Sequence, residues 1–101
     1  MSDNTALVNK VNDLKTNLFR NQYKQLQNYL GDEEKAIKFL AAVAWCYEAV
    51  PKLSECTPTS VLTSFMKMAE LGLFPSNTSG QAYVLPYKNS QKGLYEAQFQ
   101  L

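Results

Sequence analysis

The residues with the most useful binding chemistry gather near the C-terminal end of the sequence. They are two lysines, two tyrosines and two glutamines: Tyr87, Lys88, Lys92, Tyr95, Gln98 and Gln100. Ammonium groups pair with phosphates, while flat rings and amides contact bases and sugars. The combination indicates a nucleic-acid surface. An ordinary solvated hairpin with a polar outer face has the same composition, so that interpretation stays open.

The rest of the chain offers little for catalysis. It has no histidine, which removes the commonest general base and metal ligand. The only cysteines, Cys46 and Cys56, do not fit a zinc pattern; two thiols in a reducing cytosol are expected, with a disulfide as the alternative. The acidic run at residues 32–34 is explained by helix capping, and the glycines form no phosphate loop. We predict no enzyme activity, no metal site and no cofactor.

Composition limits where a nucleic acid can bind. The 101 residues suffice for one domain, and 10 basic against 9 acidic residues give a net charge of +1. Binding must therefore use a local patch. The first ten residues lack the apolar core of a signal peptide, and the apolar stretch 39–46 is shorter than the roughly 20 residues that span a bilayer. We expect a cytosolic protein without membrane contact.

The N-terminal part predicts an amphipathic helix. An apolar stripe repeats at spacings of four, three and four residues: Leu7, Val11, Leu14 and Leu18. The pattern becomes irregular across Arg20 and Asn21, which predicts a bend or two helices meeting near Asn21. The stripe is either a core face or a contact between subunits. We take its four residues as candidates for oligomer contact and residues 1–31 as a helical lead-in.

Two further helices have clear ends. Asp32 is a good N-cap for a helix over residues 33–50, and Pro51 stops that helix. After a connector, Thr57 followed by a proline predicts the next helix start, and Gly72 predicts its end.

The C-terminal part predicts two strands. Residues 81–87 favour a strand, residues 88–93 form a polar loop, and residues 94–101 alternate between two faces. The fold class is therefore α+β, with N-terminal helices followed by an antiparallel β-hairpin. A lone hairpin is marginally stable, and we expect its second strand to leave an exposed edge carrying Phe99 and Leu101.

The order of these segments resembles the RecT family of phage and prophage single-strand annealing proteins. The resemblance covers about residues 33–101. It is carried by the motifs PKL, ECTP, ELGL, AYVLPY and EAQFQL at residues 51–53, 55–58, 70–73, 82–87 and 96–101. In the family, the last strand continues into a turn, a long helix, a further strand and a C-terminal lobe. Residues 32–101 are thus expected to be the incomplete N-terminal part of an annealing domain.

The resemblance implies ATP-independent binding of single-stranded DNA and annealing of complementary strands in homologous recombination. It also implies homo-oligomers that form rings or helical filaments on single strands and annealed duplex, beside a partner exonuclease in the cytoplasm of a bacterial host. We expect Lys88, Lys92, Gln98 and Gln100 near DNA, with Tyr87 and Tyr95 beside them. The alternative is an interaction module that co-assembles with a full-length annealing protein without annealing by itself.

Overall fold

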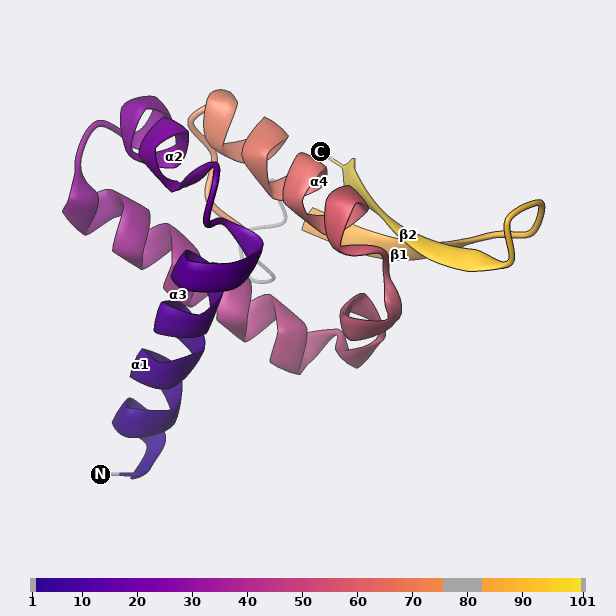
Figure 1. The fold of residues 1–101 in the computed structure, drawn as a ribbon, viewed down its shortest axis with the longest axis horizontal. Helices are drawn as coiled ribbons and strands as arrows, with labels where there is room; N and C mark the ends of the chain where they lie inside the picture. Colours follow the sequence, from indigo (N-terminus) through magenta and orange to yellow (C-terminus); the bar gives the residue numbers. More distant parts are fainter. Residues whose placement is uncertain (1, 76–82, 101) are drawn as a thin grey trace.

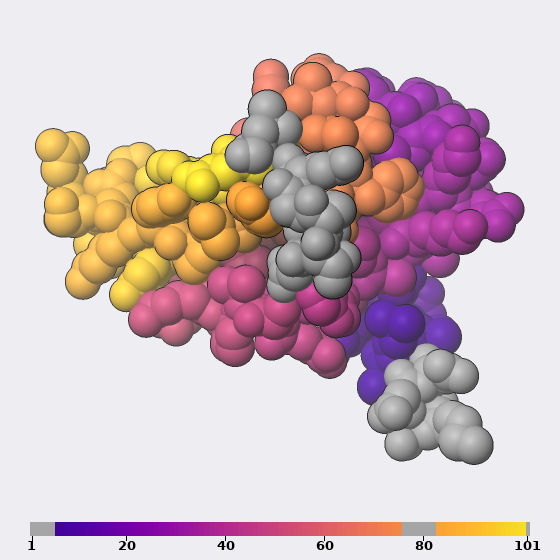
Figure 2. Space-filling view, turned by 180° about the vertical axis from the view of Figure 1, so that it is seen from behind, coloured from indigo at the N-terminus to yellow at the C-terminus, as the bar shows by residue number. Residues whose placement is uncertain are grey.

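The computed structural model describes residues 2–75 and 83–100. Their elements, in chain order, are α1 (Ser2–Asp13), the π-helix η1 (Leu14–Leu18), α2 (Tyr23–Leu30), α3 (Glu33–Ala49), the 3-10 helix η2 (Pro51–Glu55), α4 (Pro58–Glu70), β1 (Tyr83–Asn89) and β2 (Leu94–Gln100). The strands form one antiparallel sheet, so the α+β prediction is confirmed. The hairpin extends to one side of the helices, as Figures 1 and 2 show from opposite directions. Within the described ranges, no helix is long and apolar enough to cross a membrane.

The predicted break near Asn21 is confirmed, and its cause is a π-helix. α1 runs into η1, and the Phe19 N–H donates to the Leu14 carbonyl at 2.8 Å, five residues back. The extra residue in this turn shifts the helix face. In this register Phe19 is fully buried, whereas Leu18, the last member of the predicted stripe, is only half-buried.

Local capping explains where α3 and α4 begin. The Asp32 carboxylate accepts the Lys35 N–H at 2.8 Å, and the Thr57 hydroxyl accepts the Ser60 N–H at 3.4 Å. Each bond pairs an N–H that a helix start leaves free. Gly72, after α4, has a φ of 73°, the left-handed conformation expected at a helix end. The caps therefore fix both helices where the sequence predicts them.

The core lies between the helices and the inner side of the hairpin. Its largest fully buried side chains are Phe19, Leu26, Phe39, Leu40, Val43, Leu53, Val61, Phe65 and Met68. Phe39 of α3 meets Phe65 of α4 edge to face, with ring centroids 6.4 Å apart. Leu53 belongs to η2, so part of the predicted irregular connector is a 3-10 turn with a core residue.

The hairpin is in register from Tyr83, opposite Gln100, to Asn89, opposite Leu94. Its turn ends at Gly93, which has a φ of 68°. β1 thus runs two residues further than predicted. Val84 of β1 and Ala97 of β2 are buried, which defines the inner face of the hairpin.

The expectation of an exposed edge on the second strand is wrong. The Ala97 N–H donates to Ser60 Oγ at 2.9 Å, and Ser64 Oγ donates to the Ala97 carbonyl at 3.0 Å. The Thr57 N–H donates to the Tyr95 carbonyl at 3.0 Å. The start of α4 therefore occupies backbone groups that an edge would leave open. Phe99 packs partly against the core, and Leu101 lies outside the described residues.

The other edge, that of β1, carries a proline at its centre. Pro86 lies opposite Ala97, whose backbone groups bond to α4 rather than to β1. The backbone of Pro86 therefore faces the outer edge, where its missing N–H leaves no donor for another strand. This residue limits pairing along β1.

Ser64→Ala should loosen the contact between α4 and the hairpin. Ser64 is 6% exposed, and its loss leaves the Ala97 carbonyl without that donor. An unsatisfied buried carbonyl destabilises a protein by about 1–3 kcal/mol. Urea unfolding followed by circular dichroism measures the difference. Ser54→Ala is the matched control, because the exposed Ser54 hydroxyl bonds only to Pro51 in its own turn. Equal effects of the two changes would contradict the proposed contact.

Candidate nucleic-acid interface

The structure does not bring all six predicted DNA-binding side chains together. Residues directly opposite each other in a hairpin share one face. Lys88 lies opposite Tyr95, on the inner face, whereas Tyr87, Gln98 and Gln100 belong to the outer face. Lys92 is in the turn. The six residues therefore form two surfaces, separated by the hairpin itself.

A second lysine joins the pair on the inner face. Lys52 Nζ of η2 lies 5.0 Å from the ring centroid of Tyr95, a cation–π distance. The chain is held there because Cys56 forms a parallel bridge with Tyr95, next to the bond from the Thr57 N–H. We call Lys52, Lys88 and Tyr95 the lysine–tyrosine cluster. Sequence reasoning missed Lys52, because only the fold brings η2 beside β2.

The charges of this cluster are not neutralised within the described parts of the chain. Five other lysines have carboxylate partners: Lys10–Glu48, Lys15–Glu33, Lys38–Glu34, Lys67–Glu70 and Lys92–Glu96. Neither Lys52 nor Lys88 has an ion pair among the described residues. Because the whole chain has a net charge of only +1, this local excess is the patch that a phosphate would meet.

The outer face has a different character. Gln100 Nε2 donates to Tyr87 Oη at 2.5 Å, which joins two predicted residues across the strands. Glu96 accepts from Asn89 Nδ2 at 3.0 Å, and it lies 3.9 Å from Lys92 Nζ. The Glu96 carboxylate thus offsets the charge of Lys92. The outer face therefore presents amides and a phenol rather than free cations.

Glu96→Gln should strengthen binding of single-stranded oligonucleotides. The amide keeps an acceptor for Asn89 but removes the negative charge beside Lys92, so we expect a gain of roughly two- to fivefold at about 50 mM salt. Fluorescence anisotropy of a labelled oligonucleotide measures it. Glu34→Gln is the matched control, since it frees Lys38 of α3 in the same way. Equal gains from both variants would show that net charge, not this site, is responsible.

The predicted oligomer stripe divides into buried and accessible residues. Val11 and Leu14 belong to the core, whereas Leu7 is 41% exposed and Leu18 is half-buried. A neighbouring copy can therefore reach Leu7 and Leu18 but not the two residues between them. Subunit contact through this stripe stays a prediction.

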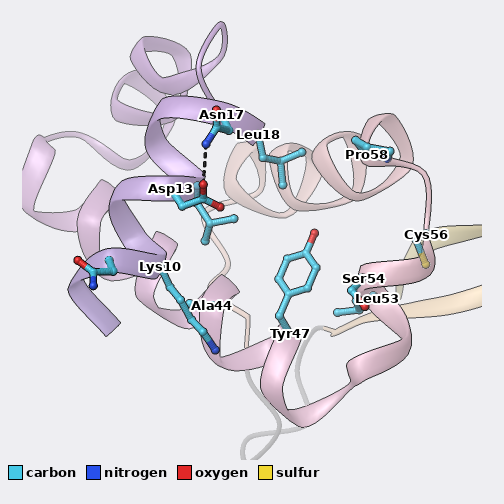
Figure 3. A pocket seen from close by; sticks show the side chains of 12 residues that line it. Lys10, Asp13, Asn17, Leu18, Ala44, Tyr47, Leu53, Ser54, Cys56 and Pro58 are labelled. Atoms are coloured by element: carbon cyan, nitrogen blue, oxygen red, sulfur yellow. Dashed lines mark hydrogen bonds between the residues drawn. The ribbon is translucent and has the colours of Figure 1, made fainter. Parts of the chain in front are cut away.

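Leu18 borders a cavity of about 580 Å³ between α1, η1, α3 and η2. Figure 3 shows the Tyr47 side chain reaching across it toward Leu18, with Leu53 beside it. At its rim, Asn17 Nδ2 donates to Asp13 Oδ1 at 2.6 Å. The wall is mostly apolar, and its lysine, Lys10, is paired with Glu48 at 2.6 Å, so the cavity offers a phosphate no unpaired cation among its lining residues.

Two neighbouring groups of α3, Tyr47 and Cys46, make stability sensitive to alkaline pH. Burial raises the pKa of the Tyr47 phenol to about 12 and that of the Cys46 thiol to about 11, from ordinary values of 10.0 and 9.0. The folded state keeps protons that the unfolded chain loses first. Stability should therefore be fully present below about pH 9 and decrease as pH rises to 12.

Urea midpoints measured between pH 8 and pH 12 check this expectation. Tyr47→Phe should remove the part of the decrease that begins near pH 10, the ordinary pKa of a phenol. Tyr29→Phe, a change at an exposed ring, should leave the profile as it is. A flat profile in the unchanged protein would contradict the argument.

The cysteines are free and buried, in agreement with two unpaired thiols. Burial raises the pKa of Cys56 as well as that of Cys46, which keeps both thiols protonated. Among the residues that the structure describes, no group of three or more His, Cys, Asp or Glu side chains could hold a metal ion. The interface is thus built from lysines, rings, hydroxyls and amides.

Comparison with known proteins shows a family match that includes this interface. The sequence profile of the RecT family matches residues 16–101, which covers η2, α4 and the whole hairpin. Searches of curated proteins and of solved structures gave no significant match. The match includes Lys52, Lys88 and Tyr95, the three members of the lysine–tyrosine cluster.

Proposed function

The chain belongs to the RecT family, and on this premise we propose that it binds single-stranded DNA and promotes annealing of complementary strands without ATP. Membership supports a role in single-strand annealing and DNA recombination. The proposal further holds that the chain acts as a binding protein without catalysis. It includes assembly of several copies on DNA in a bacterial cytoplasm, beside an exonuclease that supplies single strands.

The lysine–tyrosine cluster is the observation that carries this proposal. Two lysines without ion-pair partners in the described chain stand beside an aromatic ring, at the edge where η2 meets the hairpin. Lysines of this kind neutralise phosphates and release counterions. Tyr95, partly buried against the core, holds the Lys52 ammonium group over its ring. These contacts bind a single strand without reading its sequence.

Such contacts are sufficient for annealing because the reaction itself is downhill. Each base-pair step of a DNA duplex is stabilised by about 1.4 kcal/mol of stacking, so no nucleotide hydrolysis is needed. The obstacle is the repulsion between two phosphate backbones. A protein that neutralises part of one backbone lowers this repulsion and leaves the bases free to pair.

An annealing assay without ATP tests the proposal. Two complementary oligonucleotides carry a fluorescence donor and an acceptor, and the chain is added at about 50 mM salt, where phosphate contacts are strong. We expect faster energy transfer than without protein, together with an increase in anisotropy of either single strand. If no strand is bound even at this salt concentration, DNA binding by this chain is refuted.

A second function, co-assembly with a full-length annealing protein, has one supporting feature. At the outer edge of β1, the backbone groups of Val84 and Lys88 on either side of Pro86 have no strand beside them among the described residues. Mixing the chain with a full-length RecT-family protein and measuring particle size separates the two functions. Co-elution in the absence of annealing by the chain alone would favour the interaction module.

A further inference from the structure

A groove runs along the exposed side of α4. One hollow of about 530 Å³ lies between α4 and the outer side of β2, and a second of about 310 Å³ lies between α4 and α2. Thr63 lines both hollows, so they adjoin at this residue of α4. We call it the α4 groove. It begins at Lys92 and Gln98 of the hairpin and reaches Gln25 and Tyr29 of α2.

The groove contains polar groups that the fold does not use. The Ser60 hydroxyl accepts from the Ala97 N–H and donates to the Thr57 carbonyl, and the Ser64 hydroxyl donates to the Ala97 carbonyl. By contrast, the structure shows no hydrogen bond from the described side chains to Thr59 Oγ1, Thr63 Oγ1 or the amide of Gln98, all of which are exposed. Hydroxyls and amides of this kind both donate and accept hydrogen bonds.

Charge in the groove is balanced. Lys92 lies 3.9 Å from Glu96 at one end, and Lys67 lies 3.9 Å from Glu70 at the other. A phosphate backbone gains little from a surface where each cation has a carboxylate beside it. Sugars and base edges are uncharged, so the balanced charge of the groove does not weaken their binding. Exposed apolar surface at both ends, from Leu94 and Tyr29, suits the flat faces of bases.

We propose that the α4 groove is a second contact surface for a single DNA strand, which binds sugars and base edges rather than phosphates. This inference rests on the proposed function, since it needs a strand already bound by the chain. The groove is continuous with Gln98 and Lys92 of the predicted interface and lies across the hairpin from the lysine–tyrosine cluster. The two surfaces therefore differ in salt dependence.

A thiol footprint tests whether DNA covers the groove. Thr63→Cys introduces the only exposed thiol, because Cys46 and Cys56 are buried and protonated. Saturating oligo-dT should slow alkylation of this thiol by roughly tenfold or more, as expected for a group removed from solvent. Asn12→Cys on α1 is the control, and its alkylation should stay within about twofold. If the thiol at position 63 were alkylated at an unchanged rate while oligo-dT is bound, DNA contact with the α4 groove would be refuted.

A second variant tests the chemistry of the contact. Thr59→Val and Thr63→Val together remove both hydroxyls and preserve side-chain shape, so the helix should persist by circular dichroism. We expect affinity for oligo-dT to fall roughly three- to tenfold, with the slope of log affinity against log salt unchanged. Unchanged affinity would contradict contact between these hydroxyls and DNA. A flatter slope would contradict the claim that the groove binds uncharged groups rather than phosphates. If the unchanged chain binds DNA but these results fail, only the groove is refuted; if it binds no DNA, the proposed function and the groove fall together.

Discussion

Replacing both Lys52 and Lys88 with Gln should weaken binding of a single-stranded oligonucleotide and flatten its salt dependence. Lys52 Nζ lies over the Tyr95 ring, and Lys88 is paired with Tyr95 in the hairpin register. Neither lysine has an ion-pair partner in the described chain, so both are available to phosphates. For single strands, each neutralised phosphate contributes about 0.7 to the slope of log affinity against log salt. The double variant should therefore lose about 1.4 of slope and, at about 50 mM salt, on the order of tenfold or more in affinity.

The matched control replaces Lys24 and Lys35, which are exposed on α2 and α3 and also lack an ion pair among the described residues. It changes net charge equally but lies away from the hairpin, which Figure 1 shows on the opposite side of the fold from α2. Fluorescence anisotropy at four salt concentrations separates the variants. Equal loss of slope in both would mean that overall charge, rather than the lysine–tyrosine cluster, attracts DNA.

Lys92→Gln should have a smaller effect than Lys88→Gln, although sequence reasoning treats the two lysines alike. Lys92 already lies 3.9 Å from Glu96, so its ammonium group is less available to contact a phosphate directly than that of Lys88. The slope of log affinity against log salt should decrease less than half as much with Lys92→Gln as with Lys88→Gln. A larger loss with Lys92→Gln would move the phosphate site from the inner face to the turn.

The helix boundaries were predictable because their signals are local. Asp32 and Thr57 each accept an N–H within their own first turn, and Pro51 and Gly72 act through their own backbone. The π-helix was not predictable in this way. Its register is decided by the burial of Phe19, which depends on packing against distant parts of the chain. The regular stripe therefore overestimated the burial of Leu18.

The candidate site was predictable strand by strand but not as a whole. Alternation along β2 correctly separated Tyr95 from Gln98, because side chains of a strand alternate between faces. Placing Lys88 beside Tyr95 required the register, which the turn ending at Gly93 sets. Lys52 needed the contact between η2 and β2, and no spacing in the sequence indicates a contact over that separation.

Phe39→Ala should have the largest effect on folding, because this ring joins the parts that hold the hairpin in place. Phe39 is 0% exposed and meets Phe65 of α4 and Phe74, the latter with ring centroids 5.5 Å apart. Truncating a buried Phe lowers the free energy of unfolding by about 3–5 kcal/mol. A domain of this size has a total of about 5–15 kcal/mol, so much of its stability would be lost. Urea unfolding followed by circular dichroism measures the change.

Phe74→Ala is the control that separates burial from aromatic contact. Phe74 makes the closer of the two ring contacts but is 38% exposed, so its removal should lower the free energy of unfolding by about 1–2 kcal/mol. If Phe74→Ala were more destabilising than Phe39→Ala, Phe39 would not be the ring that stabilises the core most. Because Ser60 and Ser64 of α4 hold β2 at Ala97, loss of the α3–α4 packing should also reduce DNA binding. That reduction should follow the folded fraction, whereas Lys52→Gln with Lys88→Gln should weaken binding in a fully folded chain.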